Sequence, residues 1–416
     1  MTARERPRIV VLSTLFPHPG QPLAGLFVRE RMARVAEQLP LTVVAPVPWF
    51  PLQRLLRRRR PGFRPPAPRE ERQQGVRVLH PRFLSVPGLC KSLDGLFMAL
   101  GALGTLRRLR RHEGVDLIDA HFGYPDGHAA SLLARWLRLP FTVTLRGVEP
   151  RIGATRIRGT LMRRALARAA AVITVSTSLA DWAESAGLRR DRIHTVGNGV
   201  DTERFFPLAR AGARLELGLP ADAPVLVTVG GLTERKGFHR VLDCLPALRA
   251  RWPGLQYLVV GGASGEGDWR QRLEEQVDRL GLRDCVHFLG TIEPARLNGP
   301  LSAADVFVLA TRNEGWANVL LEAMACGLPV VATDVGGNRE VVADPRLGRV
   351  VPFGDANALA DAIDRALAQD WDHAAIRAHA ERNGWGARME SLVPLLEAAA
   401  DGPAPERPTS RVEDAS

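Results

Sequence analysis

The chain of 416 residues is poor in cysteine and tyrosine, and each of these shortages argues against a class of protein or site. Its four cysteines stand far apart with no C-x-x-C pair, which argues against a disulfide framework or a zinc ribbon and favours a reducing cytosol. The two tyrosines offer few stacking platforms for bases, and no nucleic-acid-binding motif is present. We therefore expect no nucleic-acid partner.

Long apolar runs are missing as well. A helix that spans a bilayer needs about 20 apolar residues, whereas the longest candidate, residues 95–106, has 12. The first apolar stretch, Ile9 to Phe16, stops at Pro17 without a cleavage site, so we interpret it as a strand and not as a signal peptide. These features predict a cytoplasmic protein.

Charge is distributed unevenly along the chain. Residues 1–200 hold 33 Lys+Arg against 14 Asp+Glu, a net charge of +19, whereas residues 201–416 hold 23 against 31, a net charge of −8. Only Lys91 and Lys236 are lysines, a ratio that a codon bias toward arginine largely explains. Such a bias does not explain the difference between the halves. The basic half predicts an anionic partner, either membrane lipid or a phosphorylated substrate.

Short β-branched runs alternate with helical patterns in both halves, which predicts an α/β fold with two Rossmann-like domains facing across a cleft. The turn signal Asn198-Gly199 marks the break, because the charge balance changes sign there. We expect one domain at 1–200 and a second at 201–372, of which one can hold a nucleotide and the other an acceptor. A final helix at 373–398, crossing back to the first domain, and a disordered tail at 401–416 complete the prediction.

Thirteen runs are predicted as strands: residues 8–12, 41–45, 76–79, 116–120, 141–145, 172–175, 193–196, 225–229, 256–260, 286–289, 305–309, 330–333 and 349–351. Most are nearly continuous apolar runs, which is typical of parallel strands covered by helices on both faces. In such sheets ligands bind beyond the carboxyl ends of the strands. The loops that follow the strands are therefore the places to look for chemistry.

Three of these loops in the second half combine glycine with charge. The first contains Gly231, Arg235 and Lys236, and its two cations suit a diphosphate. The second runs from Glu314-Gly315 to Glu322, where a helix is predicted to begin near Ala317–Asn318 with its N–H groups directed at an anion. The third contains Gly336-Gly337. Each loop alone is as easily an ordinary turn or a solvated helix start, but their coincidence at one sheet edge predicts a ligand site.

The order and spacing of these motifs resemble the retaining glycosyltransferase family 4, which has the GT-B fold. The resemblance covers nearly the whole chain and includes Gly25-Leu26-Phe27-Val28-Arg29-Glu30 and Asn198-Gly199-Val200-Asp201. It implies that Arg235 and Lys236 bind the donor diphosphate, Glu322 the ribose and Glu314 the transferred sugar. The remaining residues assigned to the donor are Gly25, Gly231, Gly315, Asn318, Val319, Gly336 and Gly337.

The resemblance also implies roles in the first half. In Asp119-Ala120-His121-Phe122-Gly123-Tyr124, the histidine corresponds to one that faces the donor sugar across the cleft, so His121 and Glu314 are the catalytic candidates. Without the family, His121 reads as a residue that merely caps a strand. Arg146 and Glu149 stand where many members have His and Asp. We expect Arg146 and Tyr124 to bind the acceptor.

No metal or cofactor is expected. The only Asp-x-Asp spacing is at Asp370 and Asp372, which we interpret as a solvated helix end. The donor would be a UDP- or GDP-sugar, and cationic side chains with a helix N-terminus would stabilise its leaving diphosphate, as the family resemblance implies.

The segment Val47 to Arg60 mixes Trp49, Phe50, three leucines and five arginines, and residues 107–111 hold four more arginines. Such mixtures suit insertion at an anionic membrane surface. A flexible loop with solvated charge explains them equally well, and both interpretations stay open. Insertion would make the protein peripheral on the inner face of the cytoplasmic membrane.

The sequence thus predicts a retaining transferase that moves a sugar from a nucleotide-diphosphate sugar to a glycan or lipid-linked acceptor. Two alternatives remain: a nucleotide-sugar epimerase of the same fold, and a non-catalytic nucleotide-sugar-binding protein. Turnover of the donor without an acceptor would favour the first, and binding without turnover the second.

Overall fold

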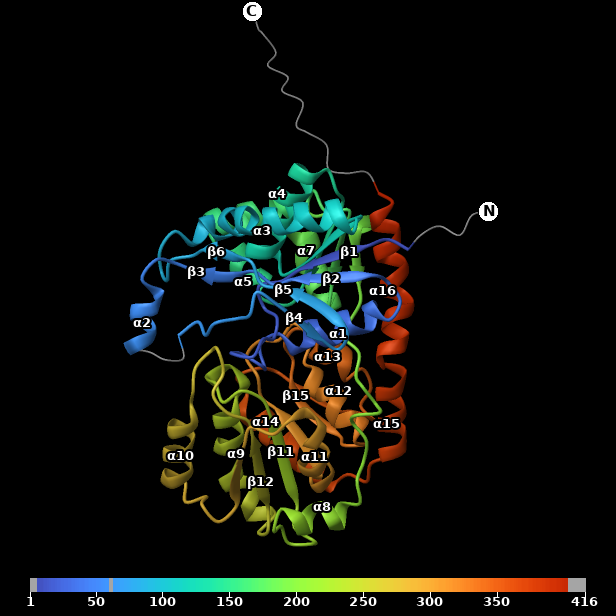
Figure 1. Ribbon diagram of the computed structural model, residues 1–416. Coiled ribbons are helices and arrows are strands. Elements are labelled where there is room, and N and C mark those ends of the chain that lie inside the picture. Colours follow the sequence, from blue (N-terminus) through green and yellow to red (C-terminus); the bar gives the residue numbers. More distant parts are fainter. Residues whose placement is uncertain (1–5, 60–62, 403–416) are drawn as a thin grey trace, which may run out of the picture. The chain divides into compact units, whose positions relative to one another are not determined.

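The computed structural model describes residues 6–59 and 63–402 (Figure 1). Within them the chain forms two units, each with its own apolar core. Unit 1 contains the chain up to Val175, Leu179–Val196 and the segment from Met389 onward. Unit 2 contains Ser176–Ser178 and Gly197–Arg388. Apart from Asp401 and Gly402, the predicted disordered tail lies outside the described residues.

Unit 1 is built on an eight-stranded sheet with the order β10-β9-β8-β7-β1-β2-β5-β4. All neighbours pair in parallel except β4 and β5. A separate parallel pair, β3 and β6, lies in the same unit. The strands are β1 (Ile9–Leu12), β2 (Leu41–Val44), β3 (Val47–Trp49), β4 (Glu70–Gln73), β5 (Val76–Leu79), β6 (Arg82–Leu84), β7 (Leu117–His121), β8 (Phe141–Leu145), β9 (Ala171–Thr174) and β10 (Ile193–Thr195).

Unit 2 is built on a six-stranded, fully parallel sheet with the order β13-β12-β11-β14-β15-β16. Its strands are β11 (Val225–Val229), β12 (Gln256–Val260), β13 (Val286–Gly290), β14 (Val306–Leu309), β15 (Val330–Thr333) and β16 (Gly348–Val351). The prediction of two Rossmann-like α/β domains is confirmed.

Helices connect the strands and cover the sheets. They are α1 (Leu26–Ala36), α2 (Gln53–Arg59), η1 (Lys91–Leu93), α3 (Asp94–His112), η2 (Gly123–Gly127), α4 (His128–Leu137), α5 (Glu149–Gly153), α6 (Arg156–Leu166), α7 (Thr177–Ser185), η3 (Arg190–Arg192), α8 (Arg210–Glu216), η4 (Glu234–Lys236), α9 (Phe238–Arg251), α10 (Arg270–Arg279), η5 (Pro294–Arg296), α11 (Asn298–Ala303), α12 (Asn318–Ala325), α13 (Asn338–Val341), α14 (Ala356–Ala368), α15 (His373–Arg382) and α16 (Trp385–Ala400).

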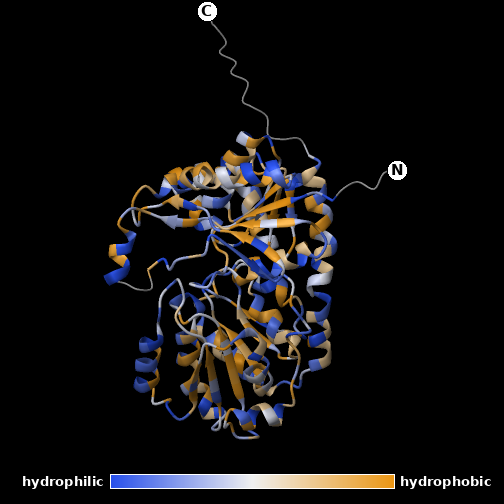
Figure 2. Ribbon diagram, in the orientation of Figure 1, coloured by the Kyte–Doolittle hydropathy of each residue, from blue (hydrophilic) through white to orange (hydrophobic). Residues whose placement is uncertain are grey.

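The central strands are buried along their whole length, as their apolar sequences predict. Every residue of β1, β7, β8, β11, β14 and β15 is buried. Figure 2 shows these strands as the hydrophobic interior, whereas α10 presents mostly hydrophilic residues. Because the side chains on both faces of these strands are buried, the side chains that can reach a ligand lie in the loops.

In each of the two large sheets the chain first runs outward from one strand and later returns to the other side of that strand. In unit 2 the chain runs outward through β11, β12 and β13, and then returns to the other side of β11 with β14. In unit 1 it runs outward from β1 through β2 and β5 and returns beside β1 with β7. A crevice forms where the two loops diverge, and ligands of open α/β sheets bind there.

Several predictions of secondary structure were incomplete. β3, β4 and β6 are short strands of three or four residues at the margin of unit 1. The predicted final helix is two helices, α15 and α16, which are interrupted at Asn383–Gly384. There the carbonyl of Asn383 accepts from the N–H of Val200, which draws the backbone out of the helical ladder.

The segment after β2 is also more ordered than a flexible loop, because it contains β3 and α2. From Met389 onward, α16 belongs to unit 1, so the chain's last helix returns to its first domain. Among the described residues, no helix is both long and apolar enough to cross a membrane.

Candidate active site

The loops after β11 and β14 meet at the strand reversal of unit 2. Arg235 and Lys236 lie on the short turn η4 after β11, and Glu314 lies between β14 and α12. The backbone joins the two loops, since the N–H of Arg312 donates to the carbonyl of Arg235 at 2.8 Å. The topology therefore brings together cations and a carboxylate that are almost 80 residues apart in sequence.

One oxygen of Glu314 is the centre of this arrangement. Its Oε1 accepts from Lys236 Nζ at 2.7 Å, from Arg235 Nη1 at 3.0 Å and from Thr311 Oγ1 at 3.1 Å. Only 10% of the Glu314 side chain and 15% of the Lys236 side chain are exposed. Partial burial strengthens these charge-assisted bonds relative to a fully solvated pair.

Arg235 has a second acidic partner that the sequence analysis missed. Its Nε and Nη2 donate to the two carboxylate oxygens of Glu266 at 2.8 and 3.0 Å. Burial lowers the pKa of Arg235, but the bonds to Glu266 and Glu314 outweigh it and raise the pKa above its usual value. Glu266 lies in the loop after β12, which also combines glycines with charge at a strand end. The signal used for the other loops would have found it.

The glycines of the third loop allow close contact between backbones. Gly336 has φ +55°, and a Cβ there would lie 1.7 Å from the carbonyl oxygen of Glu314. A side chain at this position is therefore excluded, both by conformation and by space. Gly337 donates its N–H to the carbonyl of Gly315 at 3.2 Å. The loop after β15 thus fixes the backbone that carries Glu314.

Helix α12 begins at Asn318, as predicted. Asn318 Oδ1 accepts from Asn198 Nδ2 at 2.9 Å, and Val319 and Glu322 lie half-buried in the first two turns. Gly231 lies against Ser264 of the loop after β12, where a Cβ would be 2.9 Å from that side chain. Unit 2 therefore places every predicted donor residue of this half on loops at one edge of its sheet or on the helix that follows.

In unit 1, His121 ends β7 and is completely buried. Its Nδ1 lies 2.7 Å from Arg146 Nη2, and its Nε2 lies 3.3 Å from Asp119 Oδ2. A guanidinium can only donate, so Nδ1 accepts and the ring proton is on Nε2, facing Asp119. Burial, with Arg146 close by, lowers the pKa of His121 to about 4. The imidazole is therefore neutral near pH 7 and held in one tautomer.

The backbone after His121 is strained. Phe122 has φ +75°, which is uncommon for a residue with a side chain, although its N–H and carbonyl are bonded to Thr144 and Gly127. Such conformations cost about 1–3 kcal/mol and collect at functional sites. Phe122 thus lies between His121, the last residue of β7, and the turn η2.

Arg146 is buried behind His121. Its guanidinium lies 5.3 Å from the ring centre of Phe27, and burial, followed by the charge of Arg31, lowers its pKa well below the usual value. Glu149 is also buried, and it accepts from the backbone N–H groups of Arg146, Gly147 and Gly123. Arg146 and Glu149 stand where many family members have His and Asp. Arg146 contacts the His121 ring, and Glu149 accepts hydrogen bonds from the backbone around it.

Tyr124 and Gly25 support other segments of unit 1. The buried Tyr124 hydroxyl donates to the carbonyl of Lys91 at 2.6 Å. Gly25 has φ +72° immediately before α1, and a Cβ there would lie 2.2 Å from the carbonyl oxygen of Leu15. The Tyr124 hydroxyl thus donates to η1, whereas Arg146, the other predicted acceptor residue, contacts His121.

The Asp-x-Asp pair lies at a helix end. Asp372 caps α15, because its side chain accepts from the N–H of Ala375 at 2.9 Å. Across residues 6–59 and 63–402, no group of three His, Cys, Asp or Glu side chains is arranged to hold a metal ion.

Comparison with known proteins shows matches in both units. Residues 60–204 match the family described as Glycosyltransferase Family 4, and residues 212–384 match Glycosyl transferases group 1. A D-inositol 3-phosphate glycosyltransferase of Corynebacterium urealyticum is 33% identical over 80% of this chain and 84% of its own. A protein of the same name from Xylanimonas cellulosilytica is 33% identical over 75% of this chain and 79% of its own.

Solved structures with the same fold cover nearly the whole chain. Sucrose-phosphate synthase from Thermosynechococcus elongatus has a TM-score of 0.73 and 25% identity, over 95% of this chain and 100% of its own. Anabaena HepE in complex with UDP has a TM-score of 0.72 and 22% identity, over 94% and 100%. Together with the cluster of cations and carboxylates at the strand reversal, these matches show that the chain belongs to the family 4 glycosyltransferases and has the GT-B fold.

Proposed function

We propose that this glycosyltransferase moves a sugar from a UDP- or GDP-sugar to a glycan or lipid-linked acceptor and retains the configuration of the anomeric carbon. Unit 2 binds the donor, and unit 1 binds the acceptor. The observation that carries the proposal is the convergence of Arg235 and Lys236 on Glu314 at the strand reversal of unit 2.

The two cations suit the diphosphate of the donor. Arg235 offers a planar fork of N–H donors and Lys236 a compact charge, so together they can bind two phosphate groups. Both cations form ion pairs with Glu314, and Arg235 also pairs with Glu266. A bound diphosphate replaces part of that negative charge. The donor in this proposal needs no bound metal.

In this proposal the carboxylates of Glu314 and Glu322 bind hydroxyl groups of the donor. Glu314, released in part from its cations, accepts hydrogen bonds from the transferred sugar. Glu322, one turn into α12, accepts from the ribose hydroxyls. Backbone N–H groups at the start of α12, at Asn318 and Val319, face the charge that develops on the leaving group. The glycines Gly231, Gly315, Gly336 and Gly337 let the backbone approach the ligand.

Retention follows if the leaving group acts as the base. The bond from the anomeric carbon to the diphosphate oxygen breaks, and the acceptor oxygen bonds to that carbon on the same face. The acceptor proton passes to the departing diphosphate, so no protein nucleophile is required. In this proposal the rigid, neutral His121 faces the donor sugar from unit 1, with Asp119 and Arg146 as its positioning residues.

The names of similar proteins support the donor class. Anabaena HepE is solved with UDP and with UDP-glucose, although at this identity the likeness concerns the fold. The relatives cited above act, by name, on D-inositol 3-phosphate, which is a phosphorylated polyol. A phosphorylated or otherwise anionic acceptor also fits the net charge of +19 in residues 1–200.

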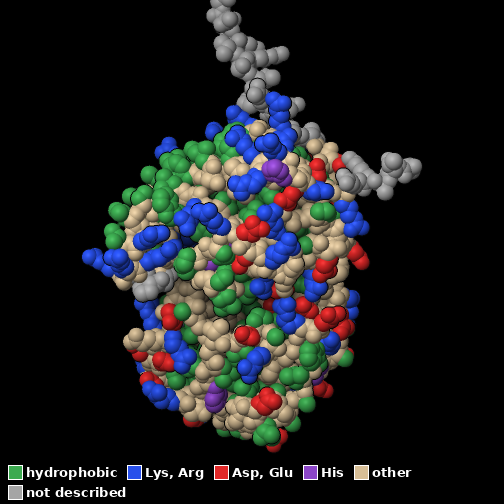
Figure 3. Space-filling view, in the orientation of Figure 1, with side chains coloured by type: hydrophobic (Ala, Val, Ile, Leu, Met, Phe, Trp, Pro, Cys, Tyr) green, Lys and Arg blue, Asp and Glu red, His purple; other side chains and the backbone are tan. Residues whose placement is uncertain are grey.

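An anionic membrane is the second partner in this proposal. Unit 1 exposes an apolar–basic patch formed by Trp49, Leu52, Leu55, Leu84, Leu89, Leu93, Arg54, Arg58 and Arg59. Leu52 and Leu89 are 73% and 63% exposed, so this surface presents apolar area beside its arginines. Figure 3 shows hydrophobic side chains gathered over β6 and the start of α3, beside arginines. We place the enzyme on the cytoplasmic face of the membrane.

Product analysis tests the proposal. The protein is incubated with UDP- and GDP-sugars and a panel of phosphorylated polyols and glycolipids, and the anomeric configuration of the product is read by NMR. Transfer with the donor configuration supports it, and an inverted product contradicts the retaining mechanism. Epimerised donor without an acceptor indicates the epimerase, and UDP or GDP binding without turnover indicates a binding protein.

A further inference from the structure

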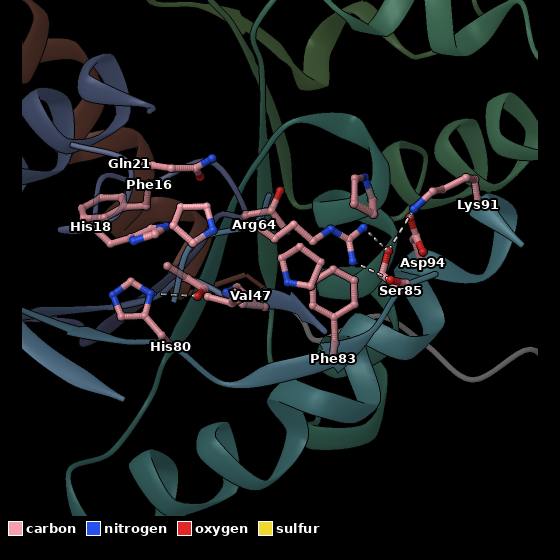
Figure 4. Close-up of a pocket in the computed structure, with 16 residues that line it drawn as sticks. Phe16, His18, Gln21, Val47, Arg64, His80, Phe83, Ser85, Lys91 and Asp94 are labelled. Carbon is pink, nitrogen blue, oxygen red and sulfur yellow. Dashed lines mark hydrogen bonds and ion pairs between the residues drawn. The ribbon is translucent and has the colours of Figure 1, made fainter. Parts of the chain in front are cut away.

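Unit 1 contains a pocket of about 330 Å³ whose lining includes neither of the predicted acceptor residues (Figure 4). Five segments line it: the loop after β1, the β2–β3 connection with the start of β3, Arg64–Pro65, the stretch from His80 to Asp94, and Pro125. Ligand pockets run from about 300 to 1,000 Å³, so this one suits a single ring with one substituent and not an oligosaccharide.

Two cations converge at one end of this pocket. Lys91 Nζ donates to Ser85 Oγ at 2.9 Å, and Arg64 Nη2 donates to the same oxygen at 3.4 Å, while Arg64 Nη1 donates to the Ser85 carbonyl at 2.6 Å. Figure 4 shows Arg64, Lys91 and Asp94 around Ser85, with His18, Gln21 and His80 at the other end. Two positive charges thus share one neutral hydroxyl, an arrangement that an anion would stabilise.

The negative charge in the pocket is smaller than the positive charge. Lys91 Nζ lies 3.1 Å from Asp94 Oδ2, and Asp94 is the only carboxylate among the described residues that line the pocket. Bonds within the described chain use two of the five N–H donors of Arg64 and two of the three of Lys91. Donors of both cations therefore remain for a ligand.

Arg64 is held in place from behind. Its guanidinium lies 5.9 Å from the ring centre of Phe50 and 5.5 Å from that of Phe63. Arg57 donates to the carbonyls of Phe63 and Arg64, which fixes the backbone of this loop. The cation is therefore positioned before any ligand arrives, which lowers the entropic cost of binding.

Lys91 is exceptional in this chain. Lysine occurs twice among 56 basic residues, and the other lysine, Lys236, lies in the donor site. Lysine offers a compact ammonium group where arginine offers a planar fork, so the two cations of this pocket differ in donor geometry. The Tyr124 hydroxyl binds the Lys91 carbonyl and so supports the turn η1 that carries this lysine.

We infer that this pocket binds a phosphate ester on a polyhydroxylated ring, with Arg64 and Lys91 on the phosphate and the ring toward His18 and Gln21. The inference rests on the proposed function, because it makes this ring the acceptor. The proline and phenylalanine side chains of the wall, among them Phe16 and Phe83, offer apolar surface to the faces of the ring.

Calorimetric titration of the full chain, saturated with UDP, tests the inference. The probes are glucose 6-phosphate, inositol phosphate, and uncharged glucose and inositol. We expect binding of at least one phosphorylated ring and much weaker binding of the uncharged one. Lys91→Gln and Arg64→Gln should each weaken it about tenfold or more, because each removes a charge-assisted bond. Lys91→Arg should recover only part of the loss.

The matched control is Arg135→Gln, which removes the same charge from an exposed position on α4. It should leave phosphate-ester binding unchanged. UDP affinity and the thermal unfolding curve should be unchanged in all four variants, which shows that both units fold. If the phosphorylated rings bind equally well to the parent, Lys91→Gln and Arg64→Gln, the inference is wrong.

Vesicles of phosphatidylcholine, with and without phosphatidylinositol, identify the source of the phosphate. Binding of phosphatidylinositol vesicles that is lost in Lys91→Gln supports a lipid headgroup, and binding of the soluble rings alone supports a free acceptor. If UDP binds but neither source depends on Lys91, the pocket inference fails while the proposed function stands. If neither UDP nor GDP binds, the proposed function itself is wrong.

Discussion

Glu266 binds Arg235 through both carboxylate oxygens, at 2.8 Å from Nε and 3.0 Å from Nη2. Arg235 is also the cation proposed to bind the donor diphosphate. The Glu266 carboxylate therefore accepts from the same guanidinium N–H groups that a phosphate of the donor would use. Glu266 and the donor compete for Arg235.

Replacement of this carboxylate should strengthen donor binding. Glu266 is 53% exposed, so its pair with Arg235 is worth no more than about 1 kcal/mol. We expect Glu266→Gln to lower the dissociation constant of UDP or GDP about two- to fivefold, as measured by calorimetry. Glu274→Gln on α10, which loses a comparable surface pair with Arg270, is the matched control. Weaker nucleotide binding in Glu266→Gln would mean that this carboxylate contacts the donor itself.

Removal of either cation should have the opposite effect. Arg235→Ala and Lys236→Ala each delete a charge-assisted contact of about 1.5–3 kcal/mol, so nucleotide-diphosphate affinity should fall at least about tenfold. Arg312→Ala, in the adjoining loop, removes an exposed charge paired with Glu234 and should leave the affinity unchanged. Normal UDP and GDP binding in both of the first two variants would place the donor site elsewhere.

The two glutamates should separate binding from turnover. Glu322→Gln weakens one acceptor for the ribose, so affinity for free UDP or GDP should fall. Glu314→Gln releases Arg235 and Lys236 from their carboxylate, so nucleotide affinity should be kept or improved while the rate of transfer falls. Titration with UDP or GDP and steady-state rates measure the two effects. The reverse pattern would exchange the two roles, and unchanged values in both variants would refute the site.

The buried Asp126 should make the folded protein less stable as pH rises. Burial raises its pKa from 3.8 to about 7, although Thr14 donates to it from the backbone N–H and the hydroxyl. Between these values the unfolded chain has lost a proton that the folded protein keeps. The stabilising contribution is therefore present below about pH 4 and is lost as pH rises toward 7.

Asp126→Asn has no such proton to lose. Its melting temperature should fall less than that of the parent between about pH 4 and 7, as measured by thermal unfolding. Asp181→Asn, at an exposed position in α7, is the control and should follow the parent. The pKa of His121, lowered to about 4, acts in the opposite sense between pH 6.5 and 4, but it is common to all three proteins. Parallel curves for parent and Asp126→Asn would show that Asp126 is ionised in the fold.

Membrane binding should depend on exposed arginines of the apolar–basic patch. Arg54, Arg58 and Arg59 are exposed on α2, whereas Arg57 holds the backbone at Phe63 and Arg64 and is left intact. The parent should sediment with anionic vesicles and only weakly with neutral ones. The difference should shrink as salt rises, because the Debye length is about 8 Å at physiological ionic strength.

Triple replacement of these arginines by serine should remove most of the difference. Replacement of Arg135, Arg164 and Arg168, which are exposed in the same unit, lowers the charge equally and serves as the control. Equal sedimentation with neutral and anionic vesicles, or none with either, would contradict the membrane proposal.

Much of this protein can be predicted from its sequence, because local patterns carry the information. Apolar runs such as Val225–Val229 must be buried on both faces, and a helix could be expected at Asn318 from the loop before it. The same reasoning placed Gly231, Arg235, Glu314 and Gly336 at strand ends, where parallel sheets bind ligands. Since each of these signals lies within a few neighbouring residues, no tertiary contact is needed to recognise it.

The tertiary structure alone decided which of these groups meet. Convergence of Lys236 and Arg235 on one oxygen of Glu314, the competing Glu266, and the Arg146 contact that fixes the His121 tautomer all join residues on different loops. The hydrogen bonds to Ser85 Oγ also bring together Arg64 and Lys91, which lie on different segments of the chain. A sequence specifies which charges follow which strands, but the strand order and the loop geometry determine their distances, and electrostatic interactions depend on distance.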